Sequence, residues 1–149
     1  MQNYQQLTEN LTDLRVLGVD FGTKKLGFAI LHWSLDEAVL PLGVVIKHKP
    51  DVEIISDVAK EHHCTAVVIG NCDNSSNLKT VVKLQEAIQK KLNIPVFLQD
   101  ERLTTYAANE ILKDIGMKRK DRNMVDDAVA AHLILEDFVW ELKRYIHNR

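Results

Sequence analysis

The feature that most constrains this chain is the stretch 15–30, RVLGVDFGTKKLGFAI, in which two apolar runs flank a short polar break. The first run, Val16 to Val19, is apolar throughout, which is typical of a short buried strand. The second run begins at Leu26, so residues 21–25, which contain a glycine, predict the connection of a β-hairpin. Asp20 ends the first run, and a carboxylate at the end of a buried strand is costly unless it is paired or binds a metal. The stretch therefore predicts a hairpin that carries a carboxylate in need of partners.

The rest of the chain alternates strand and helix patterns. Further strands are predicted at 42–47, 66–69 and 94–98, and helices from Pro50 to His63 and at 78–92, 104–115 and 124–145. The opening hairpins require antiparallel pairing, whereas the later strand–helix–strand units require parallel pairing with right-handed crossovers. We therefore expect an α/β fold with one mixed five-stranded sheet and helices on both faces. Residues 1–14 are polar and aperiodic, and they predict a loose N-terminal extension or short helix outside the core of a single domain, 15–149.

Composition narrows the class of protein only slightly. A length of 149 residues suits one domain, and a net charge of −2 neither indicates nor excludes a nucleic-acid partner. No run of about 18 apolar residues suggests a membrane span. The first residues lack the basic start and apolar core of a secretory signal, and there are only two cysteines, so we expect a protein of the reducing cytoplasm.

Carboxylates recur after the last predicted strand, at Asp100 and Glu101, and near the start of the last predicted helix, at Asp126 and Asp127. Ligands of open α/β sheets gather beyond the strand ends, so these groups are expected near Asp20. At about 100° per residue, Asp127 begins the apolar stripe of the last helix, whereas Asp126 belongs to a mixed face. The stripe continues through Ala131, Ile134, Leu135, Phe138 and Leu142.

Converging carboxylates repel one another, and Mg²⁺, which prefers oxygen ligands, relieves this repulsion. Two such ions about 3.5–4 Å apart can activate a water and stabilise the leaving oxygen of a phosphodiester. The spacing alone leaves an ordinary alternative open. In that alternative Asp20 is a turn former, the 100–101 pair is solvated, and the 126–127 pair complements a helix dipole.

Three motifs in this order resemble the YqgF/RuvX family, described as Holliday-junction resolvases and as pre-16S rRNA nucleases. They are DFGTKKLGFAI (20–30), DERLTT (100–105) and MKRKDRNMVDDAVAAHLILE (117–136). The resemblance implies a ribonuclease H-like fold with Asp20, Glu101 and Asp127 as catalytic ligands of Mg²⁺ or Mn²⁺. The choice between Asp100 and Glu101 stays open, with Glu101 favoured. The chain departs from the family at 70–77, GNCDNSSN, where the family has a Gly-Leu-Pro loop, and this departure predicts an altered fit to the substrate.

We therefore predict a metal-dependent endonuclease that acts on structured nucleic acid, with 5′-end processing of pre-16S rRNA in ribosome biogenesis as its function. Cations near all three carboxylates would hold the phosphate backbone, and they are Lys24, Lys25, Arg102, Lys118, Arg119, Lys120 and Arg122. The chain would act as a monomer or weak homodimer.

Three alternatives remain. A Holliday-junction resolvase would use a two-fold dimer to cut two strands. A catalytically degenerate RNA-binding or ribosome-assembly protein would account for the altered 70–77 loop. The motif D-x-G-T-x-x-x-G also resembles the phosphate-binding start of sugar kinases and actin-like ATPases. A chain of 149 residues is too short for the two related domains that close on ATP in those proteins.

Overall fold

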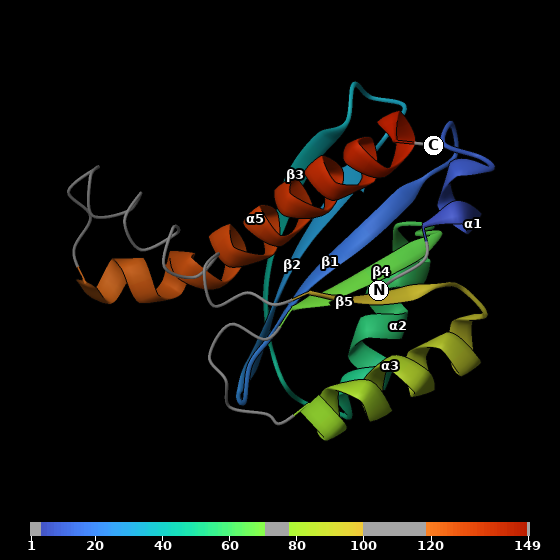
Figure 1. Ribbon diagram of the computed structural model, residues 1–149. Coiled ribbons are helices and arrows are strands. Elements are labelled where there is room, and N and C mark those ends of the chain that lie inside the picture. Colours follow the sequence, from blue (N-terminus) through green and yellow to red (C-terminus); the bar gives the residue numbers. More distant parts are fainter. Residues whose placement is uncertain (1–3, 71–77, 100–118, 149) are drawn as a thin grey trace.

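The computed structural model describes residues 4–70, 78–99 and 119–148, and residues 119–128 by their backbone only. One sheet of five strands runs in the order β3-β2-β1-β4-β5 (Figure 1). The strands are β1 (Arg15–Phe21), β2 (Lys25–His32), β3 (Ala38–Ile46), β4 (Ala66–Gly70) and β5 (Val96–Gln99). The helices are α1 (Gln5–Thr8), α2 (Asp51–Glu61), α3 (Leu78–Leu92) and α5 (Arg119–His147).

The pairing within the sheet confirms the predicted mixture. Strands β1, β2 and β3 pair antiparallel, whereas β1 pairs parallel with β4, and β4 parallel with β5. The parallel pairs are joined through α2 and α3, because a parallel connection needs a crossover. The carboxyl ends of β1, β4 and β5 therefore lie at one edge of the sheet.

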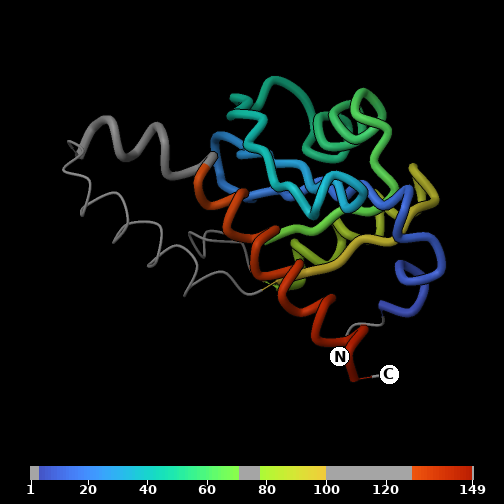
Figure 2. Tube along the Cα trace, turned by 90° about the horizontal axis from the view of Figure 1, so that it is seen from above, coloured from blue at the N-terminus to red at the C-terminus, as the bar shows by residue number. Residues whose placement is uncertain are grey.

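The helices cover both faces, as Figures 1 and 2 show: α5 crosses one face, while α2 and α3 pack on each other against the opposite face. Each face has its own apolar core. The α5 side includes Val16, Val68, Ile134 and Phe138, and the α2–α3 side includes residues such as Val19, Ile55, Ile69 and Ile88. No helix in the described ranges is both long and apolar enough to cross a bilayer.

The N-terminal segment differs from the expected loose extension. The short helix is present as α1, but Tyr4, Leu7 and Leu14 are buried in the core on the α5 side. The Tyr4 ring packs against the rings of Phe97 and Phe138, and its hydroxyl donates to a carboxylate oxygen of Glu141 at 2.8 Å. The prediction that this segment lies outside the core is wrong, because three apolar anchors in a polar stretch are enough to dock it.

Three predicted boundaries also need correction. The hairpin connection is shorter than predicted, since β2 already begins at Lys25. Strand β3 begins at Ala38 rather than after Pro41, and a bulge lies opposite Phe28 and Ala29. Proline is tolerated there because β3 is an edge strand. The last helix begins earlier than the predicted residue 124, since α5 starts at Arg119.

Candidate active site

Asp20 lies within the sheet ladder rather than beyond it, because β1 continues to Phe21. Its side chain is buried, with 4% exposed. The residues that pair with it are both glycines, Gly27 in β2 and Gly70 in β4. Cross-strand partners project to the same face of a sheet, so neither neighbouring strand places a side chain beside this carboxylate. The predicted burial of this carboxylate is thus confirmed. The two cross-strand positions beside it contribute no side chain.

The end of β5 reaches the same row. Gly70 pairs in turn with Gln99, the last residue of β5, so Asp20 and Gln99 face the same side of the sheet with a glycine between them. The next two residues of the sequence are Asp100 and Glu101. Both lie outside the described residues, as do Arg102, Lys118 and the altered segment 71–77. The topology therefore brings Gln99, the residue that precedes the DERLTT motif in the sequence, to the row of Asp20.

Helix α5 approaches β1 closely on this face. A Cβ added at Gly18, two residues before Asp20, would lie 2.6 Å from Cγ of Leu135 and 3.1 Å from the carbonyl oxygen of Ala131. The predicted apolar stripe is confirmed, since five of its members are fully buried: Ala131, Ile134, Leu135, Phe138 and Leu142. A glycine beneath the helix permits this contact.

Asp127 lies on α5 four residues before Ala131, one turn along the same stripe. Figure 1 shows α5 running opposite to β1, so this turn lies toward the carboxyl end of β1. Asp126 and Asp127 are both inside α5 rather than in its first turn, which removes the reading that they complement a helix dipole. The side chains of residues 119–128 are not described, so a contact between Asp127 and Asp20 stays a prediction. The part of the structure that describes side chains contains no cluster of three potential metal ligands.

Cations gather at the hairpin end. Lys24 is exposed in the connection, and Lys25 is half-buried at the start of β2. The carbonyl oxygen of Lys24 accepts a hydrogen bond from the backbone N–H of Lys47 at 3.0 Å, which brings the end of β3 alongside. The Lys47 ammonium lies 4.6 Å from the centre of the Phe21 ring and 3.2 Å from a carboxylate oxygen of Asp51. Sequence reasoning missed Lys47, because a single lysine after a strand carries no signal without its register.

The other predicted cations lie apart from this hairpin in the sequence. Arg119, Lys120 and Arg122 belong to the beginning of α5, where the backbone alone is described. Their predicted contacts with phosphate remain predictions.

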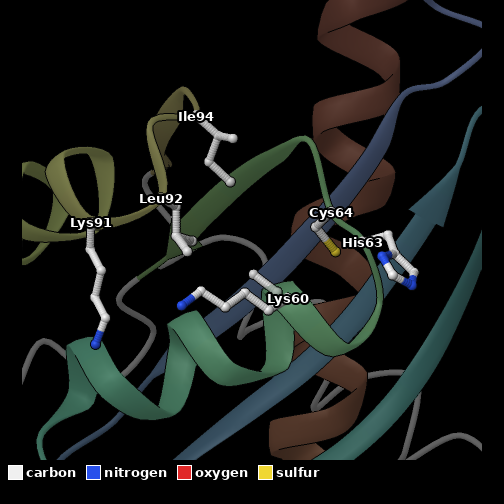
Figure 3. Close-up of a pocket in the computed structure, with 7 residues that line it drawn as sticks. Lys60, His63, Cys64, Lys91, Leu92 and Ile94 are labelled. Carbon is white, nitrogen blue, oxygen red and sulfur yellow. The ribbon is translucent and has the colours of Figure 1, made fainter.

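A pocket of about 300 Å³ lies between the ends of α2 and α3 (Figure 3). Lys60, His63 and Lys91 line it together with Cys64, and its lining includes no carboxylate. Burial raises the pKa of the Cys64 thiol to about 12, so this free cysteine is a poor nucleophile at neutral pH. Lysines here also complement the negative ends of two helices. This pocket is not suited to metal-assisted hydrolysis, and the row of Asp20 is the better candidate.

A mixed five-stranded sheet with α5 across one face and α2 and α3 on the other is a ribonuclease H-like fold. The structure is similar to the crystal structure of the fowlpox virus Holliday junction resolvase, with a TM-score of 0.60 and 12% sequence identity over 87% of this chain and 99% of that chain. At this identity the likeness shows the fold alone. The model of the family described as "RuvX: Holliday junction resolvase" matches residues 14–141, and the chain belongs to this family.

Close relatives agree with the family match. The chain is 40% identical over 135 residues to a "Putative pre-16S rRNA nuclease" of Rickettsia rickettsii (strain Sheila Smith), which covers 86% of this chain and 87% of that protein. It is 41% identical over 142 residues to a protein of the same name from Rickettsia canadensis (strain McKiel), covering 91% and 92%. The predicted family and fold are confirmed, and the chain is a nuclease of this family, a hydrolase of phosphodiester bonds.

Proposed function

We propose that this nuclease is a metal-dependent endonuclease that processes the 5′ end of pre-16S rRNA in the cytoplasm. Its catalytic residues would be Asp20, Glu101 and Asp127, and residues 4–14 would belong to the same domain as residues 15–149. The observation that carries the proposal is the buried Asp20 in a row that ends one residue before the DERLTT motif. The names of the relatives at 40–41% identity support rRNA as the substrate.

The chemistry of the donor set fits a divalent cation. Nucleases of this fold generally depend on a divalent metal ion. Carboxylate oxygens are ligands that Mg²⁺ and Mn²⁺ favour. Burial of a carboxylate such as Asp20 costs less when a cation or a hydrogen-bond donor lies beside it, and its two cross-strand partners are glycines, which carry no side chain. Asp20, Glu101 and Asp127 would hold Mg²⁺ or Mn²⁺, which when bound supplies charge stabilisation at the reacting phosphate.

The remaining residues would position the nucleic acid. Lys24 and Lys25 project from the hairpin end, next to the row of Asp20. Phosphate contacts of this kind fix the register of a nucleic acid without reading its sequence. The other proposed contacts come from Arg102, Lys118, Arg119, Lys120 and Arg122. Selectivity for the precursor would then depend on its folded shape rather than on base edges.

A second candidate function is resolution of four-way DNA junctions, favoured by the description of the matching family. Backbone contacts fit branched DNA as well as structured RNA, but two symmetric cuts would need a two-fold dimer. We propose a monomer or weak homodimer. A catalytically degenerate RNA-binding or assembly role is the third candidate, and it predicts that the carboxylates are dispensable.

The test is cleavage of a pre-16S 5′-end transcript in Mn²⁺ by single carboxylate variants. Asp20→Asn, Glu101→Gln and Asp127→Asn should each lose about a hundredfold or more of the cleavage rate, as expected when one stabilising group is removed. The matched controls are the neighbouring carboxylates, and Asp100→Asn and Asp126→Asn should retain activity.

Full activity of Asp20→Asn and Asp127→Asn would remove the proposed site. Loss in Asp100→Asn with retention in Glu101→Gln would move the ligand by one residue. A four-way junction supplied in parallel separates the substrates, since efficient junction cleavage without transcript cleavage would favour the resolvase function.

A further inference from the structure

The row of the sheet that contains Asp20 holds one other polar side chain. Reading across from β2 to β5, the paired residues are Gly27, Asp20, Gly70 and Gln99. All four face α5, since Gly18 and Phe97, two residues before Asp20 and Gln99, pack on that side. Gln99 is therefore the nearest side chain that β4 or β5 contributes in register with Asp20.

Gln99 connects this row to α5. Its amide nitrogen Nε2 donates to the carbonyl oxygen of Ile134 at 3.4 Å. A backbone carbonyl has two lone pairs, so this oxygen can accept from Gln99 and still take part in the helix. Both ends of the bond are shielded, because Gln99 is half-buried and Ile134 is fully buried. The bond joins the end of β5 to the middle of the helix.

The position of this bond on α5 is related to Asp127. Ile134 follows Asp127 by seven residues, which places the two within about 20° of the same helix face and about 10 Å apart along the axis. Close packing over Gly18 sets how near the helix lies to the sheet, but apolar contacts tolerate small slips along the axis. A directed hydrogen bond to one carbonyl does not, because a slip would place a different group opposite the amide.

We propose that Gln99 is a positioning residue that holds α5 in the register at which Asp127 meets the metal beside Asp20. This inference rests on the proposed function, because it assumes the metal site of Asp20, Glu101 and Asp127. Gln99 acts through the helix and needs no contact with metal or substrate. Gln99 is also the last residue of β5, which precedes Glu101 in the sequence, so one side chain would join the strand before one proposed ligand to the helix that carries another.

The chain contains a matched control. Gln85 of α3 is also a half-buried glutamine, and its Nε2 donates to the carbonyl oxygen of Val96, the first residue of β5, at 2.6 Å. That bond ties β5 to a helix on the opposite face, at the far end of the strand from Gln99. Replacing either glutamine with methionine removes the amide while keeping the length of the side chain. Gln85→Met therefore reports what the loss of any such bond does to the fold.

The experiment titrates metal-free protein with Mn²⁺ by calorimetry, for wild type, Gln99→Met, Gln85→Met and Asp20→Asn. Gln99→Met should bind Mn²⁺ about tenfold more weakly, the range seen when a group that orients metal ligands is removed. Cleavage of the transcript should then need more Mn²⁺ but recover most of its rate at saturating metal. Gln85→Met should bind Mn²⁺ as wild type does. If Gln99→Met fails to fold, Gln99→Leu takes its place.

The outcomes separate the two proposals. Wild-type Mn²⁺ affinity in a folded Gln99 variant, or equal weakening in Gln85→Met, would overturn the positioning role. Undiminished Mn²⁺ binding by Asp20→Asn would instead overturn the metal site itself. Loss of binding in Asp20→Asn together with selective weakening in Gln99→Met supports both.

Discussion

Asp20 places a carboxyl group among buried residues that are mostly apolar. Its neighbours along β1, Val19 and Phe21, face the opposite core and are buried with it. Removing a carboxylate from water costs on the order of several kcal/mol. Pairing with a cation, or binding to a metal ion, can offset a cost of this size. The two glycines across from it mean that the adjacent strands offer no side-chain donor at that row. A cation held beside Asp20, as proposed above, would offset part of this cost.

His32, at the end of β2 far from the hairpin connection, leads to a prediction about how the stability of the fold depends on pH. The pKa of His32 is lowered, chiefly by burial and also by the charges of Arg15 and His62. Below pH 6.5, the ordinary pKa, the unfolded chain takes up a proton that the folded chain resists, so stability falls as the pH drops. His32→Gln should therefore lose less stability than wild type between about pH 7.5 and 5.5.

Urea unfolding at the two pH values checks this, by comparing the change in midpoint for the variant with that for wild type. An equal change in both proteins would mean that His32 titrates normally in the folded state.

Individual residues also show which features of the site could be predicted from the sequence and which could not. The burial of Asp20 could be predicted because its strand is a local apolar run. Gln99 and Lys47 could not, since each owes its role to a partner distant in the sequence, the Ile134 carbonyl for one and the hairpin connection for the other. A pattern read along one segment contains no information about such pairings.

Among the elements, β1 and α5 approach each other closely at Gly18. Gly18→Ala would place a methyl group 2.6 Å from Cγ of Leu135 and 3.1 Å from the carbonyl oxygen of Ala131, both in a buried layer. Overpacking of this kind costs about 1–3 kcal/mol. We expect Gly18→Ala to lower the free energy of unfolding by that amount, measured in urea.

The shortest approach is to a side chain, so the cost should depend on it. In a Leu135→Ala background, the same Gly18→Ala substitution should cost less, because the added methyl group meets a smaller side chain. A double-mutant cycle measures this coupling. Equal costs in both backgrounds would show that the backbone contact alone limits residue 18.

Element boundaries show which forces a sequence pattern captures. The bounds of α2, α3, β4 and β5 lie within two residues of the predicted ones, because each of these elements carries a local apolar period or run. The burial of Tyr4, Leu7 and Leu14 depends instead on a surface formed by α5 and β5. The early start of α5 at Arg119 could not be predicted, because the first residues of this helix are mostly charged and show no apolar periodicity.

For the whole molecule, charge balance decides how it can attract a polyanion. Nineteen basic and 21 acidic residues leave a net charge of −2, so a general field cannot draw in nucleic acid. Attraction must come from local groups, and the described candidates at the hairpin end, near Asp20, are Lys24, Lys25 and Lys47. Lys90 and Lys91 lie instead at the end of α3, on the side of the sheet away from α5.

This difference in location predicts a difference in salt dependence. Lys24 and Lys90 are both exposed lysines, so Lys24→Ala and Lys90→Ala remove the same charge from two places. Each phosphate contact releases counterions, and its loss should reduce the slope of log affinity against log salt by about one. We expect Lys24→Ala to weaken binding of the precursor transcript at low salt and to flatten this slope, while Lys90→Ala leaves both unchanged.

Fluorescence anisotropy of a labelled transcript measures both quantities, with Asp20→Asn as the background to prevent cleavage. Equal slopes for Lys24→Ala and Lys90→Ala would mean that the nucleic acid does not contact the hairpin. That result would contradict the substrate-binding role proposed for Lys24.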